Sequence, residues 1–203
     1  MELKNTVLKT GTTTMGIICQ DAVILATESQ ATMGYYVASK DTQKLYKVAN
    51  NVGMTISGGV ADCQQIIRNL SALIELRMLD LNRELTVKSI SQLTSVILFQ
   101  NRMFPYMSML LLGGFDKEGP HLYTLDPFGS LLEEKGFASV GSGSVVGIGV
   151  LESNYKKNIT VAEGIALVKR AIDAARKRDT ASGGPIQVAV IDKDGLRFEE
   201  IKE

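Results

Sequence analysis

Residues 11–28 read Gly-Thr-Thr-Thr-Met-Gly-Ile-Ile-Cys-Gln-Asp-Ala-Val-Ile-Leu-Ala-Thr-Glu, a stretch with two apolar runs rich in β-branched residues. The runs 15–20 and 22–27 are separated by Asp21 alone, which predicts two strands joined by a tight hairpin. Strands joined in this way are antiparallel, because parallel strands need a long crossover connection. The stretch therefore predicts an antiparallel sheet.

Outside this hairpin, the hydrophobic periodicity predicts further strands and two pairs of helices. Strands are expected at 35–40, 45–48, 52–57, 107–113, 121–125, from 131 onward, at 186–191 and at 196–199. Helices are expected at 61–81, 86–101, 145–154 and 160–177. Thr86 is a candidate N-cap without the glutamate of a full capping box. The pattern favours one α+β domain in four layers, with helices on both sides of two stacked antiparallel sheets. A doubly wound parallel sheet is the less favoured alternative.

The composition is that of an ordinary globular protein without charge bias. The chain has 203 residues, 45% hydrophobic, and 22 Lys and Arg balance 22 Asp and Glu. No basic stripe indicates nucleic acid, and no apolar run approaches the roughly 18 residues of a membrane span. Residues 1–11 lack the apolar region of a signal peptide. Cys19 and Cys63 lie in separate patterns, so we expect free thiols and a reducing compartment.

The histidine content limits the chemistry that the chain can perform. His121 is the single histidine, and it lies in a strand pattern where a solvated side chain is expected. A Ser-His-Asp or Cys-His device would have to use it, and an ordinary zinc site needs more ligands than one histidine and two distant cysteines. No phosphate-binding loop or dinucleotide fingerprint is present. Hydrolytic chemistry here needs a base other than histidine, and we expect no metal or cofactor.

The run from Gly11 to Thr14 has two interpretations. Threonine is β-branched and common in strands, so three in succession before an apolar stretch are typical of a strand start. The other interpretation is chemical. If the chain is cut after Gly11, the α-amine of Thr12, with an ordinary pKa of about 8, becomes a base beside the Thr12 hydroxyl. The run alone does not decide between them.

Polar residues elsewhere also have ordinary interpretations when each is taken alone. Glu28 and Lys44 adjoin predicted strands, and long charged side chains are usually exposed. Gly58 ends a strand. The segments 141–144, Gly-Ser-Gly-Ser, and 178–184, Arg-Asp-Thr-Ala-Ser-Gly-Gly, have the composition of turns. Propensity by itself would select none of them as a functional site.

Taken together and in this order, these motifs closely resemble a proteasome β subunit of the archaeal type, a member of the N-terminal nucleophile hydrolases. The resemblance extends from Gly11 to about Val190, and several separated motifs align with those of the family in the same order. It implies the αββα sandwich that the periodicity also predicts. It further implies that residues 1–11 are a propeptide, removed when the Thr12 hydroxyl attacks the Gly11 carbonyl, and that residues 12–203 are one catalytic domain.

The resemblance implies a role for each residue of the catalytic set. Thr12 is the nucleophile and, through its freed α-amine, the base. Lys44 places a positive charge near the hydroxyl, and Glu28 pairs with Lys44 because an unpaired buried lysine is costly. Gly58 donates its backbone N–H to the oxyanion. The residues that orient the amine and its water are Ser142, Asp179 and Ser182.

The resemblance also suggests substrate contacts. The positions matched to the first specificity pocket or its surroundings are Ala31, Thr42, Tyr46, Ile56, Val60 and Gln64. Thr32 matches a residue whose backbone holds the substrate peptide. Small, apolar and uncharged walls predict cleavage after hydrophobic residues. Ser29-Gln30 and the segment 34–36 depart from the archaeal pattern, which affects fine specificity rather than mechanism.

The implied function is a self-activating threonine endopeptidase that cleaves unfolded proteins to short peptides in the cytoplasm. The implied partners are proteasome α subunits, homo-heptameric β rings within a four-ring barrel of twenty-eight subunits, and a regulatory ATPase ring acting through the α rings. The alternatives are a non-catalytic ring subunit, an amidase for small molecules and a subunit of the bacterial two-component relative. The presence of Gly11, Thr12, Glu28, Lys44 and Asp179 together favours activity.

Overall fold

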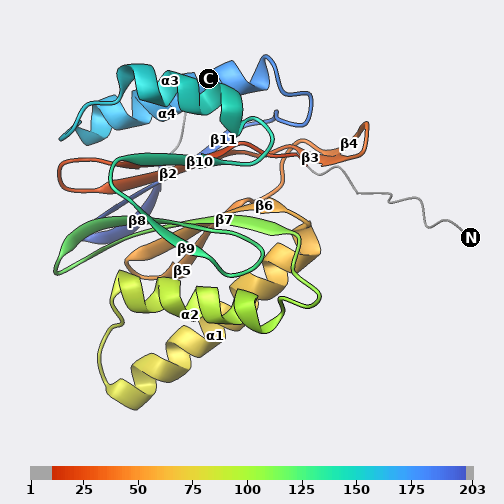
Figure 1. The fold of residues 1–203 in the computed structure, drawn as a ribbon. Helices are drawn as coiled ribbons and strands as arrows, with labels where there is room; N and C mark the ends of the chain where they lie inside the picture. The colour runs from red at the N-terminus through yellow and green to blue at the C-terminus, as the bar shows by residue number, and fades with distance from the viewer. Residues whose placement is uncertain (1–10, 200–203) are drawn as a thin grey trace, which may run out of the picture.

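Two five-stranded antiparallel sheets lie face to face between two pairs of helices in the computed structural model, which describes residues 11–199 (Figure 1). The first sheet has the order β10 (Phe137–Val140), β1 (Thr14–Ile18), β2 (Val23–Glu28), β11 (Ile186–Asp192) and β12 (Gly195–Glu199). The second has the order β5 (Leu45–Ala49), β6 (Val52–Gly58), β7 (Ser108–Asp116), β8 (Gly119–Leu125) and β9 (Leu131–Glu134). A separate hairpin pairs β3 (Ala31–Met33) with β4 (Tyr36–Ser39).

The helices cover the outer faces of the two sheets (Figure 1). The pair α1 (Val60–Leu81) and α2 (Val87–Gln100) packs on the second sheet, and the pair α3 (Ser144–Asn154) and α4 (Val161–Arg176) packs on the first. The four-layer α+β prediction is therefore confirmed, and the doubly wound parallel alternative is wrong, since every strand pair in the described residues is antiparallel.

Three apolar clusters fill the spaces between the four layers. One lies between α1, α2 and the second sheet, another between α3, α4 and the first sheet, and the third between the two sheets. Strand β11 contributes to two of them, because successive side chains of a strand point to opposite faces. Val188 and Val190 pack toward the helices, whereas Ala189 and Ile191 pack toward the other sheet.

Threonine side chains cap the N-termini of two helices. The Thr86 side chain accepts a hydrogen bond from Ser89 N at the start of α2, as the sequence predicts. Thr160 caps α4 in a full capping box with Glu163, a feature that the sequence interpretation did not identify. Such caps satisfy backbone N–H groups that have no partner within the helix.

The structure differs from the predicted elements in three places. The strand expected from residue 131 is two strands, β9 in the second sheet and β10 in the first, so the chain crosses between sheets over residues 135–136. Strand β3 was not predicted, because three residues are too short to show a period. The solvated histidine prediction is also wrong, since His121 is only 13% exposed and its Nε2 lies 3.2 Å from Asp116 Oδ1.

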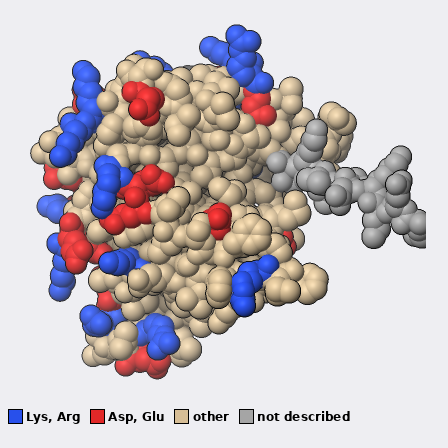
Figure 2. Space-filling view, viewed as in Figure 1, with Lys and Arg blue, Asp and Glu red and all other residues tan. Residues whose placement is uncertain are grey.

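The surface shows no large region of one charge on the face in Figure 2, where acidic and basic side chains are interspersed. Within residues 11–199, no helix has the length and apolar content needed to cross a membrane. Residues 1–10 of the expected propeptide lie outside the described residues.

Candidate active site

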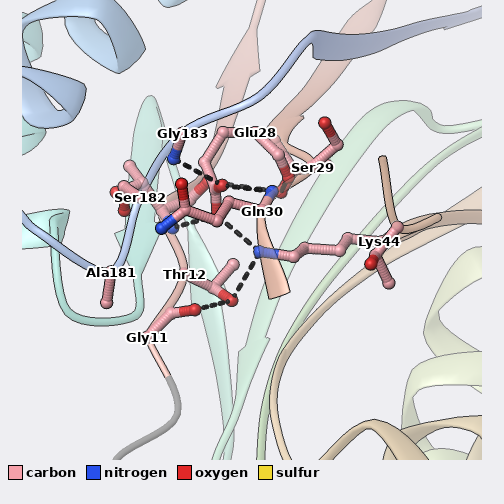
Figure 3. Close-up of polar contacts among 12 residues, drawn as sticks. Gly11, Thr12, Glu28, Ser29, Gln30, Lys44, Ala181, Ser182 and Gly183 are labelled. Carbon is pink, nitrogen blue, oxygen red and sulfur yellow. Dashed lines mark hydrogen bonds and ion pairs between the residues drawn. The ribbon is translucent and has the colours of Figure 1, made fainter. Parts of the chain in front are cut away.

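The predicted catalytic residues meet at one end of the first sheet (Figure 3). Thr12 lies two residues before β1, Glu28 is the last residue of β2, and Lys44 directly precedes β5 of the second sheet. The loop between α4 and β11 brings Asp179 and Ser182 to the same place. Antiparallel pairing of β1 with β2 puts Thr14 opposite Thr27, so the chain just before β1 lies beside the end of β2.

The Lys44 ammonium joins the nucleophile candidate to a buried carboxylate. Its Nζ donates to Thr12 Oγ1 over 2.9 Å and to Glu28 Oε1 over 2.5 Å. All three residues are buried, with Glu28 fully inaccessible. The ordinary interpretation of Glu28 and Lys44 as surface charges is therefore wrong. A lysine that donates to a hydroxyl oxygen favours the alkoxide, because it places positive charge where negative charge develops.

The Glu28 carboxylate accepts hydrogen bonds from donors in four parts of the chain. Besides Lys44 Nζ, Oε1 accepts the backbone N–H of Thr13, and Oε2 accepts the N–H groups of Gln30 and Gly183 at 2.7 and 2.9 Å. A buried carboxylate needs this degree of pairing, since desolvation of an unpaired charge costs several kcal/mol. The Glu28 carboxylate thus ties β1, the segment after β2 and the loop before β11 into one unit.

A second hydrogen-bonded set surrounds the nitrogen of Thr12. Thr12 N donates to Ser142 Oγ over 3.1 Å, and Ser142 Oγ donates to Asp179 Oδ2 over 2.5 Å. Ser182 Oγ donates to the same Asp179 oxygen over 2.6 Å and lies 2.7 Å from Thr13 Oγ1. Because an ionised carboxylate only accepts, Asp179 fixes the direction of both hydroxyl chains. The structure therefore brings Ser142, Asp179 and Ser182 together around the nitrogen that the cleavage hypothesis frees.

The Gly11–Thr12 peptide bond lies within this set. Thr12 Oγ1 donates to Gly11 O over 2.6 Å, so the hydroxyl and the carbonyl that it is predicted to attack are in direct contact. A Cβ added at Gly11 would lie 1.9 Å from Ala181 Cβ and 2.8 Å from Ser142 Oγ. The site has no room for a side chain at this position, a constraint that the sequence alone does not reveal.

Two glycines of the sequence motifs, Gly141 and Gly58, have positive φ values. Gly141 has a φ of +99°, and a Cβ there would lie 2.0 Å from Thr12 O and 2.9 Å from Ser57 Oγ, so the end of β6 approaches Thr12. Gly58, the last residue of β6, has a φ of +125°, and its Cβ would lie 2.1 Å from Met107 O. Only glycine adopts this backbone without strain. The oxyanion role of Gly58 stays a prediction.

The predicted substrate residues occupy several elements around the set. Ala31 and Thr32 lie in β3, and Thr32 Oγ1 accepts a hydrogen bond from Gln30 Nε2. Ile56 is 3% exposed and belongs to the cluster beneath α1 and α2, against which Tyr46 also packs. The other predicted contacts are Thr42, Val60 and Gln64. Of these, Gln64 is an exposed residue of α1. Their substrate roles are not tested by this arrangement and stay predictions.

Burial shapes the electrostatics of the site. It lowers the pKa of Lys44 below its ordinary value, and the carboxylates of Glu28 and Asp179 oppose that shift. Elsewhere, burial raises the pKa of both Cys19 and Cys63 to about 12. Because the thiolate is the nucleophile, neither cysteine is suited to covalent catalysis. Thr12 is therefore the better nucleophile candidate.

Three contributors to the site were not identified from the sequence. Thr13 was expected only to support Thr12 in the strand, yet its N–H and hydroxyl contact Glu28 and Ser182. The N–H groups of Gln30 and Gly183 bind Glu28. Backbone donors leave no mark in residue identity, so the sequence carried no pattern that could have revealed them. A Cβ at position 183 would lie 2.3 Å from Gln30 Oε1, so the present position of the Gln30 side chain depends on this glycine.

Comparison with known proteins places this arrangement in a family. The sequence profile described as proteasome subunit matches residues 8–191. A relative named proteasome subunit beta from Methanosarcina mazei is 46% identical over 95% of this chain and 93% of its own length. Proteins of the same name from Methanococcoides burtonii and Methanocaldococcus jannaschii are 48% and 45% identical, over 91% and 95% of this chain and 88% and 87% of their own lengths. The chain belongs to the proteasome subunit family, and these relatives are archaeal β subunits.

Proposed function

We propose that this chain is a threonine-type endopeptidase, the proteolytic β subunit of a proteasome core. The observation that carries the proposal is the contact of Lys44 Nζ with both Thr12 Oγ1 and Glu28 Oε1 in a buried site. A chain that only filled a ring position would not need a buried ammonium held against a hydroxyl, because burying such a charge is costly. The names of its relatives support assembly into a proteasome core with α subunits. The heptameric β ring is part of the proposal.

Maturation is the first reaction of the proposed cycle. The Thr12 oxygen bonds to the Gly11 carbonyl carbon, the Gly11–Thr12 C–N bond breaks, and the hydroxyl proton passes to the Thr12 nitrogen. Water then hydrolyses the resulting ester, which releases residues 1–11 and restores the Thr12 hydroxyl. The 2.6 Å contact between Thr12 Oγ1 and Gly11 O supports this step.

Peptide cleavage uses the same atoms after maturation. The Thr12 oxygen attacks the substrate carbonyl while the free α-amine, directly or through water, takes the hydroxyl proton and later passes it to the leaving amine. Lys44 stabilises the alkoxide and keeps the α-amine less basic, because like charges disfavour protonation. Ser142 and Asp179 orient the amine, and the N–H of Gly58 binds the oxyanion.

The proposed substrates are unfolded polypeptides, cleaved preferentially after hydrophobic residues. The apolar side chains of Ala31, Ile56 and Val60 favour such a residue, and an extended peptide can pair beside the strand that bears Thr32. The chain would then work in a cytoplasmic particle that receives substrate from a regulatory ATPase ring. No second function is favoured by a particular contact in the described residues.

Mass spectrometry and peptide hydrolysis test the proposal. The chain is co-expressed with a partner α subunit, and the assembled particle is analysed by intact mass and with a hydrophobic fluorogenic peptide. The parent is expected to lose residues 1–11 and to cleave the peptide. Thr12→Ala is expected to keep those residues and to be inactive, with Thr6→Ala in the predicted leader as the matched control. A Thr12→Ala particle as active as the parent would refute the assignment.

A further inference from the structure

The main chain that carries Lys44 is held between the two sheets. Lys44 O accepts a hydrogen bond from Ile56 N of β6 over 3.0 Å, which fixes it to the second sheet. Lys44 N donates in the opposite direction, to Gln187 Oε1 of β11 over 3.0 Å, which fixes it to the first sheet. The two sheets are separate layers (Figure 1), so this residue is a point at which they are joined by polar contacts.

Gln187 makes three hydrogen bonds to the segment around Lys44. Its Oε1 also accepts Leu45 N over 3.2 Å, and its Nε2 donates to Thr42 O over 3.0 Å. One carboxamide therefore uses both lone-pair directions of its oxygen and one amide hydrogen on residues 42–45. These hydrogen bonds hold the main chain of the segment that enters β5. They are separate from the hydrogen bonds of the Lys44 ammonium.

The orientation of Gln187 follows from its strand. Ala189 and Ile191 lie between the sheets, and alternation along β11 points Gln187 the same way. Its register partner on β2 is Thr27, the residue before Glu28. Gln187 thus ties the Lys44 main chain to the strand pair that supports the Glu28 carboxylate.

We infer that Gln187 is a positioning residue that sets the location of the Lys44 ammonium beside Thr12 by anchoring the Lys44 main chain. The inference rests on the proposed function, because it gives Lys44 its role in the reaction. The Lys44 side chain is 4% exposed, and its packed surroundings leave it little freedom to compensate for a shift of its main chain. The 2.9 Å contact of the ammonium with Thr12 Oγ1 therefore depends on where that main chain lies. A displacement of about 1 Å can lower the rate of an enzyme about 100-fold.

Two substitutions remove this anchor in different ways. Gln187→Met keeps the length of the side chain and removes all three hydrogen bonds. Gln187→Asn keeps the amide and shortens its reach by one methylene. Gln65→Met is the matched control, because Gln65 is also partly buried and donates a side-chain hydrogen bond, to Asn69 Oδ1 within α1. Each is assembled with the α subunit and assayed per matured subunit, with maturation measured by intact mass.

The expected result is a kcat at least about tenfold below the parent for both Gln187 variants, with KM changed less than about twofold. The acidic limb of the kcat profile should also move to higher pH. Three charged groups surround the Thr12 α-amine. Lys44 contacts the hydroxyl of the same residue, Glu28 accepts the N–H of Thr13, and Asp179 accepts from Ser142, the acceptor of Thr12 N. If the ammonium moves away, the two carboxylates dominate and the amine holds its proton to higher pH. A defect in folding alone would lower kcat by the same factor at every pH and would leave the acidic limb at the pH of the parent.

The outcomes separate this inference from the proposed function. Gln65→Met is expected to match the parent. An assembled Gln187→Met or Gln187→Asn particle that keeps residues 1–11, while Gln65→Met loses them, would support the inference, since maturation uses the same ammonium. If either Gln187 variant assembles with the kcat and acidic limb of the parent, the inference is overturned. If Thr12→Ala is active, the proposed function fails instead.

Discussion

Lys44 Nζ lies 2.9 Å from Thr12 Oγ1, although the two residues enter different sheets of the sandwich. The contact exists because the segment before β5 approaches the start of β1 and the end of β2, where Glu28 Oε1 accepts the same ammonium over 2.5 Å. The proposed catalytic arrangement is therefore also a link between the two layers. Substitutions of the residues in this contact should therefore lower both the stability and the activity of the chain.

The charge on Lys44 should be required for stability as well as for catalysis. Lys44→Met leaves the buried Glu28 carboxylate without its cation, and breaking a buried pair costs about 3–5 kcal/mol. Lys44→Arg retains the charge and should cost less, yet it should also be inactive because the planar guanidinium does not replace a single ammonium donor. Urea unfolding of the unassembled subunit measures the first effect and peptide hydrolysis the second. A fully stable Lys44→Met subunit would contradict this account of the pair.

Gly11→Ala should block leader removal. Its Cβ would lie 1.9 Å from Ala181 Cβ, so the backbone must move and the Gly11 carbonyl must leave its contact with Thr12 Oγ1. Intact mass of the assembled particle is expected to stay at the full-length value. The double variant Gly11→Ala with Ala181→Gly removes the atom responsible for the clash and should recover part of the processing. Normal processing of the single variant would show that the carbonyl position is not critical.

Gly58→Ala should destabilise the chain and remove activity. The φ of +125° is strained for any L-residue, and the new Cβ would lie 2.1 Å from Met107 O. Such backbone strain costs about 1–3 kcal/mol, and loss of an oxyanion donor typically lowers kcat about 10²–10³-fold. Gly149→Ala is the control, since a Cβ at that helical position meets no heavy atom within 4 Å. Unfolding and hydrolysis assays in which the two variants behave alike would argue against this explanation.

Asp179→Asn should slow the reaction without unfolding the chain. The carboxylate accepts Ser142 and Ser182 through Oδ2 and the N–H of Ala181 through Oδ1 at 3.1 Å. An amide NH₂ in either place faces a donor, so the orientation of the amine should be disturbed and kcat should fall about 10²-fold. Asp173→Asn, on α4 and paired with Arg176, is the control and should keep the parent rate. Equal kcat values for the two variants would exclude the orienting role.

Stability at acid pH should depend on Asp116. Burial by itself would raise the pKa of Asp116, but hydrogen bonds from the N–H groups of Glu118 and Val87, together with His121, hold it below its ordinary value of 3.8. The unfolded chain therefore binds this proton more readily than the folded chain. The stabilisation is present above pH 3.8 and is lost as the pH falls through the folded-state value.

Asp116→Asn should reduce this pH dependence. Unfolding by urea at pH 7 should show a loss of about 1–3 kcal/mol, because charge-assisted hydrogen bonds are lost. The fall in stability between pH 5 and pH 3 should be shallower than in the parent. Asp80→Asn, at an exposed position on α1, should keep the slope of the parent. An unchanged slope in Asp116→Asn would mean that another group controls the acid transition.

The sequence by itself determined the layered architecture and the order of most elements. The continuous apolar runs in 15–27 mark strands that are buried on both faces, and the period near 3.6 in 61–81 marks the buried face of a helix. Both signals are carried by residues close together in the chain. The motifs around Thr12, Lys44 and Asp179 identified the family because several of them occur in one order. The hydrophobic pattern could not show that the chain changes sheet between β9 and β10, because strands of the two sheets have similar sequence patterns.

Only the tertiary structure decided how the site is held together. Glu28 and Lys44 are charged side chains next to strands, and nothing in their local sequence shows that both are buried and only 2.5 Å apart. The other donors to Glu28 are backbone N–H groups, which every residue other than proline carries. Gln187 lies more than 140 positions from Lys44 in the chain and contacts it through the packing of two sheets. Contacts of this kind depend on how layers pack, and a one-dimensional pattern does not contain that information.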